Sequence, residues 1–203
     1  MVINRIVTLL AALKPATVQA HCDTAEGPAV KDGRKALETG NINYALKWIP
    51  ADGEAELRDV FEKALKVRTF GAEAAELADR LFLETMVRIH RMGEGVGFTG
   101  IQPVGTQIDP VVKAADEAIV LGSDADLLPM VPEERRAGLD KRFQAAVALK
   151  DFDVEDVEAG RRYLAAYVSF LKYAEGEDHE HHGHEHHGHE GHDHGEHGSG
   201  HEH

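Results

Sequence analysis

The residues best suited to chemistry lie at the C-terminal end, where imidazole side chains crowd together. Residues 178–203 hold twelve of the chain's fourteen histidines, interleaved with seven carboxylates and with glycines. Neutral imidazole binds Ni(II), Zn(II), Cu(II) and Co(II) well, and flexible glycines let several ligands converge on one ion. The predicted metal ligands in this segment are His179, His181, His182, His184, His186, His187, His189, His192, His194, His197, His201 and His203.

This His-rich tail (residues 178–203) contains no apolar residue, so it cannot pack onto a core and we expect it to be disordered without metal. Its charge should rise, and its metal should be released, as the pH falls through the free imidazole pKa of about 6.5. The alternative is a tail that only keeps the protein soluble. Glutamates alone would suffice for that purpose, so the histidines favour metal binding.

A second group of possible ligands follows an N-terminal leader. Arg5 precedes the apolar run Ile6–Leu13, and residues 18–20 have the small-x-small pattern that signal peptidase cleaves. We therefore predict a signal peptide over residues 1–20 and a periplasmic or secreted protein. The alternative is a short amphipathic helix in a cytoplasmic protein. A spanning helix is not expected, since it needs about 20 apolar residues.

Cleavage after Ala20 would place His21 and Cys22 at a new N-terminus. An amine, an imidazole and a thiolate would then lie within two residues, which is enough to bind a transition metal. Cys22 is the only cysteine, so it has no partner for an internal disulfide. We predict His21 and Cys22 as ligands, with Asp23 orienting them; in the alternative, Asp23 merely caps the next helix.

This start resembles the His-Cys N-terminus of nickel superoxide dismutase. The resemblance implies a nickel hook, and such a hook needs a second cysteine that this chain lacks. A redox nickel site of that kind is therefore not expected.

The interior of the chain contributes one more histidine, His90, near the end of a helical pattern over residues 72–92. We predict it as a third ordered metal ligand; in the alternative it is a buried histidine bonded to a carbonyl. Glu84 and Arg88 would orient it if that face is buried, although a salt-bridge ladder with Arg80 explains them equally well. Glu94 could reach His90 only if the helix continued through Gly93, and the glycine-rich run 93–100 argues against this.

The elements that must position these residues read as two copies of one unit. An offset of 82 aligns residues 27–91 with residues 109–173 and matches proline, glycine and aromatic positions alike. In both copies the apolar residues recur at helical spacing, and no stretch alternates as a strand would. We predict an all-α domain over residues 21–177, a helical bundle of two tandem pseudo-repeats. The expected helices cover 29–38, 41–48, 54–69, 72–92, 110–121, 124–130, 132–150 and 154–174.

The candidate ligands have no counterparts in the second copy, where Lys172 takes the place of His90. The second copy is therefore predicted to be scaffold. The net charge of −14 argues against nucleic acid and anionic membrane surfaces as partners. The run 93–100 follows a helix rather than a strand, so we interpret it as a joint between the copies and not as a nucleotide-binding loop.

Several stretches together resemble a bacterial family catalogued as a domain of unknown function with an HCDT-x-x-GP start. They are HCDTAEGP at residue 21, ALETGN at residue 36, ALKWIP at residue 45 and RIHRMGEG at residue 88. The resemblance spans about residues 21–174. It implies a helical protein whose pattern includes His21, Cys22 and His90, and it implies no activity.

These observations predict a protein that binds a divalent transition metal ion (Ni, Zn, Cu or Co). It would act as a buffer, a sensor or a delivery factor that passes the ion to a metal-accepting protein partner. The alternative is a metalloenzyme, redox or hydrolytic, with its site at His21, Cys22 and His90. No motif sets an oligomeric state.

Overall fold

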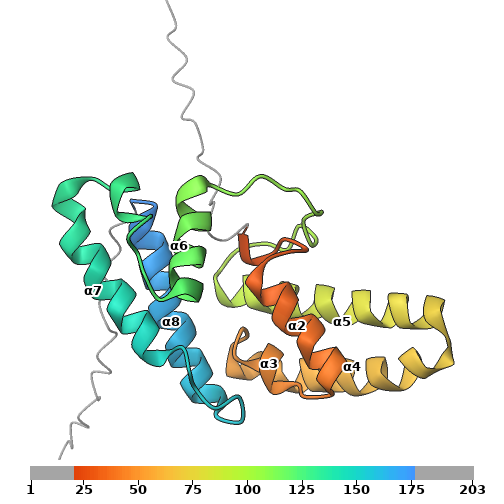
Figure 1. The fold of residues 1–203 in the computed structure, drawn as a ribbon. Coiled ribbons are helices and arrows are strands. Elements are labelled where there is room, and N and C mark those ends of the chain that lie inside the picture. Colours follow the sequence, from red (N-terminus) through yellow and green to blue (C-terminus); the bar gives the residue numbers. More distant parts are fainter. Residues whose placement is uncertain (1–20, 177–203) are drawn as a thin grey trace, which may run out of the picture.

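The computed structural model describes residues 21–176, and within this range the chain forms seven α-helices and no strand (Figure 1). The all-α prediction is confirmed. None of the helices in the described range is both long and apolar enough to cross a bilayer. The predicted signal peptide (1–20) and His-rich tail (178–203) lie outside the described residues.

The first half is a helical hairpin with a third helix packed across it. A 3-10 turn and Gly71, whose φ of 135° suits glycine, reverse the chain between the two hairpin helices. The helices are α2 (Pro28–Thr39), α3 (Asn43–Leu46), α4 (Glu54–Val67) and α5 (Ala72–Gly93), with 3-10 turns at Ala51–Gly53 and Arg68–Phe70.

The second half forms another hairpin, with α6 packed against α8 (Figure 1). Asp109 and Asp156 cap α6 and α8 by accepting a hydrogen bond from the backbone N–H of Val111 and of Ala159, each at 2.8 Å. The elements are α6 (Pro110–Leu121), a 3-10 turn at Leu128–Met130, α7 (Glu133–Leu149) and α8 (Val157–Ala174).

Each half has its own aromatic centre. Phe61 and Phe82 pack between α4 and α5 with ring centroids 5.2 Å apart, and Phe143 and Phe170 pack between α7 and α8 at 5.6 Å. Burying one such side chain contributes about 1.5–3 kcal/mol. These contacts fix α5, which carries His90, and α8 as the central helices.

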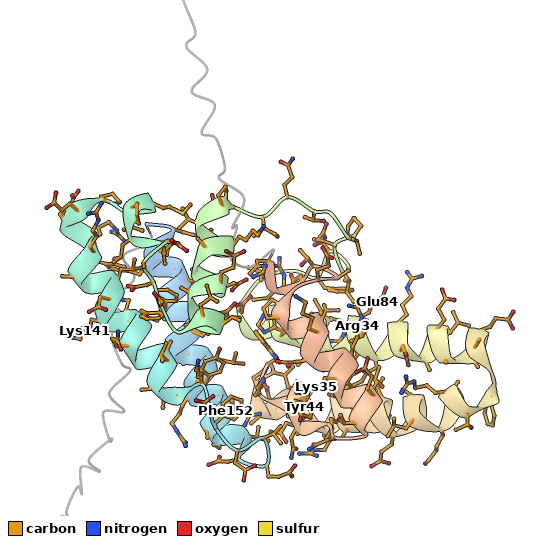
Figure 2. The ribbon with its side chains drawn as sticks, in the orientation of Figure 1. Arg34, Lys35, Tyr44, Glu84, Lys141 and Phe152 are labelled. Carbon is orange, nitrogen blue, oxygen red and sulfur yellow. The ribbon has the colours of Figure 1, made fainter. Side chains whose placement is uncertain are left out.

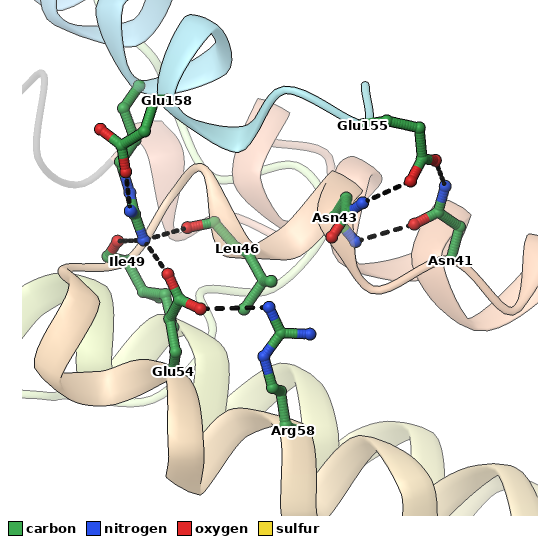
Figure 3. Close-up of polar contacts among 9 residues, drawn as sticks. Asn41, Asn43, Leu46, Ile49, Glu54, Arg58, Glu155 and Glu158 are labelled. Carbon is green, nitrogen blue, oxygen red and sulfur yellow. Dashed lines mark hydrogen bonds and ion pairs between the residues drawn. The ribbon is translucent and has the colours of Figure 1, made fainter. Parts of the chain in front are cut away.

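Polar contacts join the two halves on one side (Figure 3). Arg161 of α8 donates to the carbonyl oxygens of Leu46 and Ile49, at 3.4 and 3.2 Å, and pairs with Glu54 at 2.6 Å. Its side chain therefore links α8 both to the end of α3 and the residues that follow it and to the first residue of α4. The contact sets the distance between α6–α8 and the end of α5, where the candidate ligands lie.

Candidate functional site

The segment that holds His21, Cys22 and Asp23 is buried between the halves. The connector after α5 holds it there: Gln102 donates its backbone N–H to the Asp23 carbonyl at 3.0 Å, and Ala25 donates its own to the Gln102 carbonyl at 2.8 Å. Cys22 is 2% and Asp23 3% exposed. The predicted ligands are thus parts of an ordered interior.

Gly27, the glycine of the HCDT-x-x-GP pattern, allows this segment to fold back on itself. A Cβ at Gly27 would lie 2.2 Å from the carbonyl oxygen of His21 and 2.8 Å from that of Cys22. Both are backbone atoms that cannot move aside without displacing their residues. The motif therefore encodes the position of the candidate ligands.

His90 lies in the last turn of α5, and its side chain is buried. Its Nδ1 lies 2.8 Å from the Trp48 carbonyl oxygen. A carbonyl only accepts, so Nδ1 carries the hydrogen, and in the neutral ring Nε2 presents a lone pair. Nε2 is buried and has no hydrogen-bond partner. The predicted alternative, a histidine bonded to a carbonyl, accounts for one ring nitrogen and leaves the other available.

Glu94 adds a carboxylate, contrary to the expectation that Gly93 would separate it from His90. Helix α5 includes Gly93, and the Glu94 N–H continues the helical pattern to the His90 carbonyl at 3.2 Å. The glycine lies in close packing instead, since a Cβ there would lie 3.1 Å from Cδ of Pro50. As a result, Glu94 Oε2 lies 3.8 Å from His90 Nε2, and neither atom has a hydrogen-bond partner.

Asp23 brings a second carboxylate to the same place. Its Oδ2 pairs with Arg91 Nη1 at 2.9 Å, whereas its Oδ1 is buried without a hydrogen-bond partner. Burial raises the pKa of Asp23 to about 6; Arg91 and His90 act in the opposite direction, and Glu94 adds to the rise. The charges of Arg91, His90 and Glu94 thus all act on the Asp23 carboxyl group.

Cys22 is close to the same carboxylates. Burial raises the pKa of its thiol far above the ordinary value, and the charges of Glu94, Asp23 and Asp116 raise it further. The side chain is therefore a neutral thiol near pH 7, not the thiolate expected of an exposed N-terminal cysteine. It becomes a metal ligand only by losing its proton.

His21 pairs with residues of the second half. Its Nε2 forms an ion pair with Oδ2 of Asp116 on α6, and the Tyr167 hydroxyl on α8 donates to the other oxygen of Asp116. The second half, predicted to be scaffold, therefore contacts one of the candidate ligands directly. Asp116 could have been found from the sequence, because it interrupts the buried stripe that Val112 and Ile119 form on α6.

Glu84 and Arg88 do not take the orienting role predicted for them. Glu84 pairs with Arg80 at 2.8 Å on the surface of α5, and Arg88 pairs with Glu56 of α4. Neither contact reaches His90. Asp23 pairs with Arg91, the neighbour of His90 in the chain.

The arrangement combines an imidazole nitrogen with two carboxylate oxygens, all buried and all without hydrogen-bond partners. Such atoms fit a divalent cation, since nitrogen and carboxylate ligands suit Zn(II) and its neighbours. In the conformation described for residues 21–176, no three His, Cys, Asp or Glu side chains are grouped closely enough to hold an ion. Binding an ion here therefore requires the side chains to move closer together.

Comparison with known proteins adds a family and no activity. No curated protein matches the chain, and no solved structure does. The family match begins at Glu26, so it includes His90 and Glu94 but not His21, Cys22 or Asp23. The chain belongs to a family of unknown function, DUF6448, whose model matches residues 26–173.

Proposed function

We propose that this protein binds divalent transition metal ions, with one ordered site formed by Asp23, His90 and Glu94 and completed by Cys22. The His-rich tail would collect ions and supply them to this site. The protein would then act as an exported metal buffer or delivery factor that passes its ion to an accepting protein.

The observation that carries the proposal is the pair formed by His90 Nε2 and Glu94 Oε2, which lie 3.8 Å apart without hydrogen-bond partners. Two ligands bound tetrahedrally to zinc at about 2.0 Å each are separated by about 3.3 Å. The pair is thus about half an ångström wider than a bound pair. Leaving buried polar atoms unpaired costs on the order of 1–3 kcal/mol each, and a bound cation would offset that cost.

The local charge also favours a cation. Asp23 and Glu94 provide two carboxylates against one guanidinium, that of Arg91, which leaves a net negative site. Arg91 engages only Oδ2 of Asp23 and so holds Oδ1 in place as a free ligand. In its neutral form the imidazole is held by Trp48 in the tautomer that binds metal through Nε2.

A neutral Cys22 thiol gives the site a defined proton exchange. If its sulfur joins the ion, the thiol proton must leave, so the ion displaces a proton from the interior. The stronger the metal–thiolate bond, the more easily that proton is lost. Zn(II), Ni(II) and Co(II) bind sulfur, nitrogen and carboxylate oxygen together, whereas Mg(II) and Ca(II) prefer oxygen alone.

Matching helices in the two halves support the proposed duplication. Helices α2 and α6 each have twelve residues, begin at a proline and end before a glycine with φ 70°. The offset between them is 82 residues at both ends. We infer that an ancestral unit was duplicated, and that the first copy then kept the histidine while the second contributed Asp116.

The test compares the full-length protein with a form lacking residues 178–203, each dialysed against Ni(II) or Zn(II) at pH 7.5. We expect the full-length protein to retain several ions and the shortened form to retain one. Glu94→Gln should remove that one ion, and the control Glu84→Gln, on the same helix but paired with Arg80, should keep it. No ion on the shortened form would refute the ordered site, and an empty full-length protein would refute metal binding altogether.

Export is proposed on the leader alone and is checked separately. Mass spectrometry of the native protein should find His21 as its first residue. Retention of Met1 would refute export without affecting the metal site.

A further inference from the structure

A cleft of about 740 Å³ opens between the two halves, separate from the proposed metal ligands His90, Asp23 and Glu94. Its walls come from α2 and α3 of the first half and from α6, the segment before α8, and α8 of the second. Figure 2 shows Lys35 and Tyr44 on one side and Phe152 on the other. Its volume lies within the range of small-molecule sites, about 300–1,000 Å³.

Most of the charged side chains in this cleft that have no ion-pair partner are positive. Four lysines and four acids line it, but three of the acids are engaged within the protein. Asp32 accepts from Lys47 at 2.9 Å and from the Trp48 indole at 2.8 Å. Asp116 is held by His21 and Tyr167, and Asp153 accepts from a backbone N–H at 3.0 Å. Glu26 and Asp153 are the acids without a cationic partner among the described residues, since a backbone hydrogen bond leaves the charge of Asp153 in place.

Fewer of the cleft lysines have a charged partner within the protein. Lys47 is the one cleft lysine with an ion-pair partner in the described part of the chain. Lys35 lies over the Tyr44 ring at 4.4 Å, a contact that leaves its charge available. Lys31 and Lys150 have no acidic partner among residues 21–176. Three ammonium groups without an ion-pair partner thus face two such carboxylates, Glu26 and Asp153.

The opposite wall is aromatic. Phe152 and Tyr163 have ring centroids 5.6 Å apart, and Tyr163 and Tyr167 stack at 5.9 Å. Burial raises the pKa of Tyr163 to about 12, so its ring is uncharged at neutral pH. The partly exposed rings of Phe152 and Tyr163 beside unpaired ammonium groups suit a ligand that has both a planar ring and a negative group.

We propose that this cleft binds a small anionic molecule with a planar ring, whose carboxylate or phosphate is held by Lys31, Lys35 and Lys150. The ring lies against Phe152 and Tyr163. His21 lines the same cleft, and its Nδ1 is buried without a hydrogen-bond partner among the described residues. The site does not depend on the proposed metal function.

Trp48 makes the test direct, because it lines the cleft and is the only tryptophan in the chain. The full-length protein is titrated with phenyl phosphate and with benzoate in EDTA, by calorimetry and by tryptophan emission. Phenol and inorganic phosphate supply the ring and the charge separately. We expect saturable binding of at least one ring-bearing anion together with a change in Trp48 emission, and weaker binding of phenol and phosphate. Which of the two anions binds better identifies the acid group.

The matched variants are Lys31→Ala with Lys150→Ala, and the control Lys113→Ala with Lys141→Ala, which removes the same charge from exposed positions outside the cleft. The cleft pair should lose on the order of tenfold in affinity or more, and the control pair less than twofold. No saturable binding of either anion up to about 10 mM, or equal losses in the two pairs, would overturn the proposal. Because EDTA keeps metal away, failure here leaves the metal proposal intact, and the Glu94→Gln variant should bind the anion normally.

Discussion

His90 donates its Nδ1–H to the backbone carbonyl of Trp48, 2.8 Å away and 42 positions earlier in the chain. This bond ties the end of α5 to the turn after α3 and at the same time fixes which imidazole nitrogen remains free. Structural support and ligand chemistry therefore come from the two nitrogens of one ring, and a suitable substitution can separate them.

His90→Asn should keep the hydrogen bond to Trp48 and lose the metal ligand Nε2. The Asn amide nitrogen occupies about the position of Nδ1 and can donate to Trp48, whereas nothing replaces Nε2. We expect the free energy of unfolding, measured in urea, to fall by less than about 1 kcal/mol, and the ordered ion to be lost.

His90→Ala is the control for that experiment. It removes both nitrogens and leaves the Trp48 carbonyl unpaired, so it should cost about 2–3 kcal/mol as well as the ion. If His90→Asn retained a stoichiometric ion, His90 would be a structural residue only.

Gly27→Ala should release the N-terminal segment without unfolding the helices. The added Cβ would meet the His21 and Cys22 carbonyl oxygens, so the segment must move and Cys22 becomes accessible. Because Cys22 is the only cysteine, its reaction with Ellman's reagent reports this alone. We expect the rate to rise on the order of tenfold or more.

Gly97→Ala is the matched control, because a Cβ there meets nothing within 4 Å and the glycine has no positive φ. Its Cys22 should react as slowly as in the unchanged protein. Equal rates in both variants would show that the turn at Gly27 does not hold Cys22 in place.

The helices could be predicted closely because their signals are local. Pro28 and Gly40 bracket α2 at the predicted place, and the apolar periodicity of α4 and α5 survives in the structure. The segment expected as a helix over 124–130 forms only a 3-10 turn, which contains Pro129. In that case the missing backbone N–H of Pro129 outweighed the helical spacing of the apolar residues around it.

The site was less predictable because its contacts are distant in sequence. His21 and Asp116 are separated by 95 positions, and no spacing rule connects them. Glu94 was missed for another reason: Gly93 looked like a helix stop, whereas it lies inside the helix, packed closely against the Pro50 ring. A glycine selected for close packing and one selected for a turn look identical in a sequence.

Tyr167→Phe should destabilise the fold by leaving one oxygen of Asp116 without its donor. Removing a buried hydroxyl that serves a carboxylate costs about 1–3 kcal/mol, measured as the free energy of unfolding in urea. Tyr163→Phe is the control: its ring packs beside Tyr167, but its hydroxyl makes no hydrogen bond in the described residues, so the cost should stay within about 0.5 kcal/mol. Equal costs would mean that the Asp116 contact contributes nothing.

Acid should loosen the joint between the halves through Glu54. Burial acts to raise the pKa of Glu54, but hydrogen bonds and charges from Arg161 and Arg58 outweigh it, so the pKa lies below its ordinary value of 4.5. A carboxyl group with a lowered pKa stabilises the fold at pH values above 4.5, and this contribution is lost as the pH falls through the folded-state pKa. Glu54→Gln should therefore lower Tm by on the order of 5 °C at pH 7, with a difference from the unchanged protein that shrinks below pH 4.5.

Glu84→Gln, which disrupts only an exposed pair with Arg80, should show a small difference at every pH. A Glu54→Gln difference that stays constant down to pH 3 would contradict the assignment, because the ion pair with Arg161 requires the ionised carboxylate.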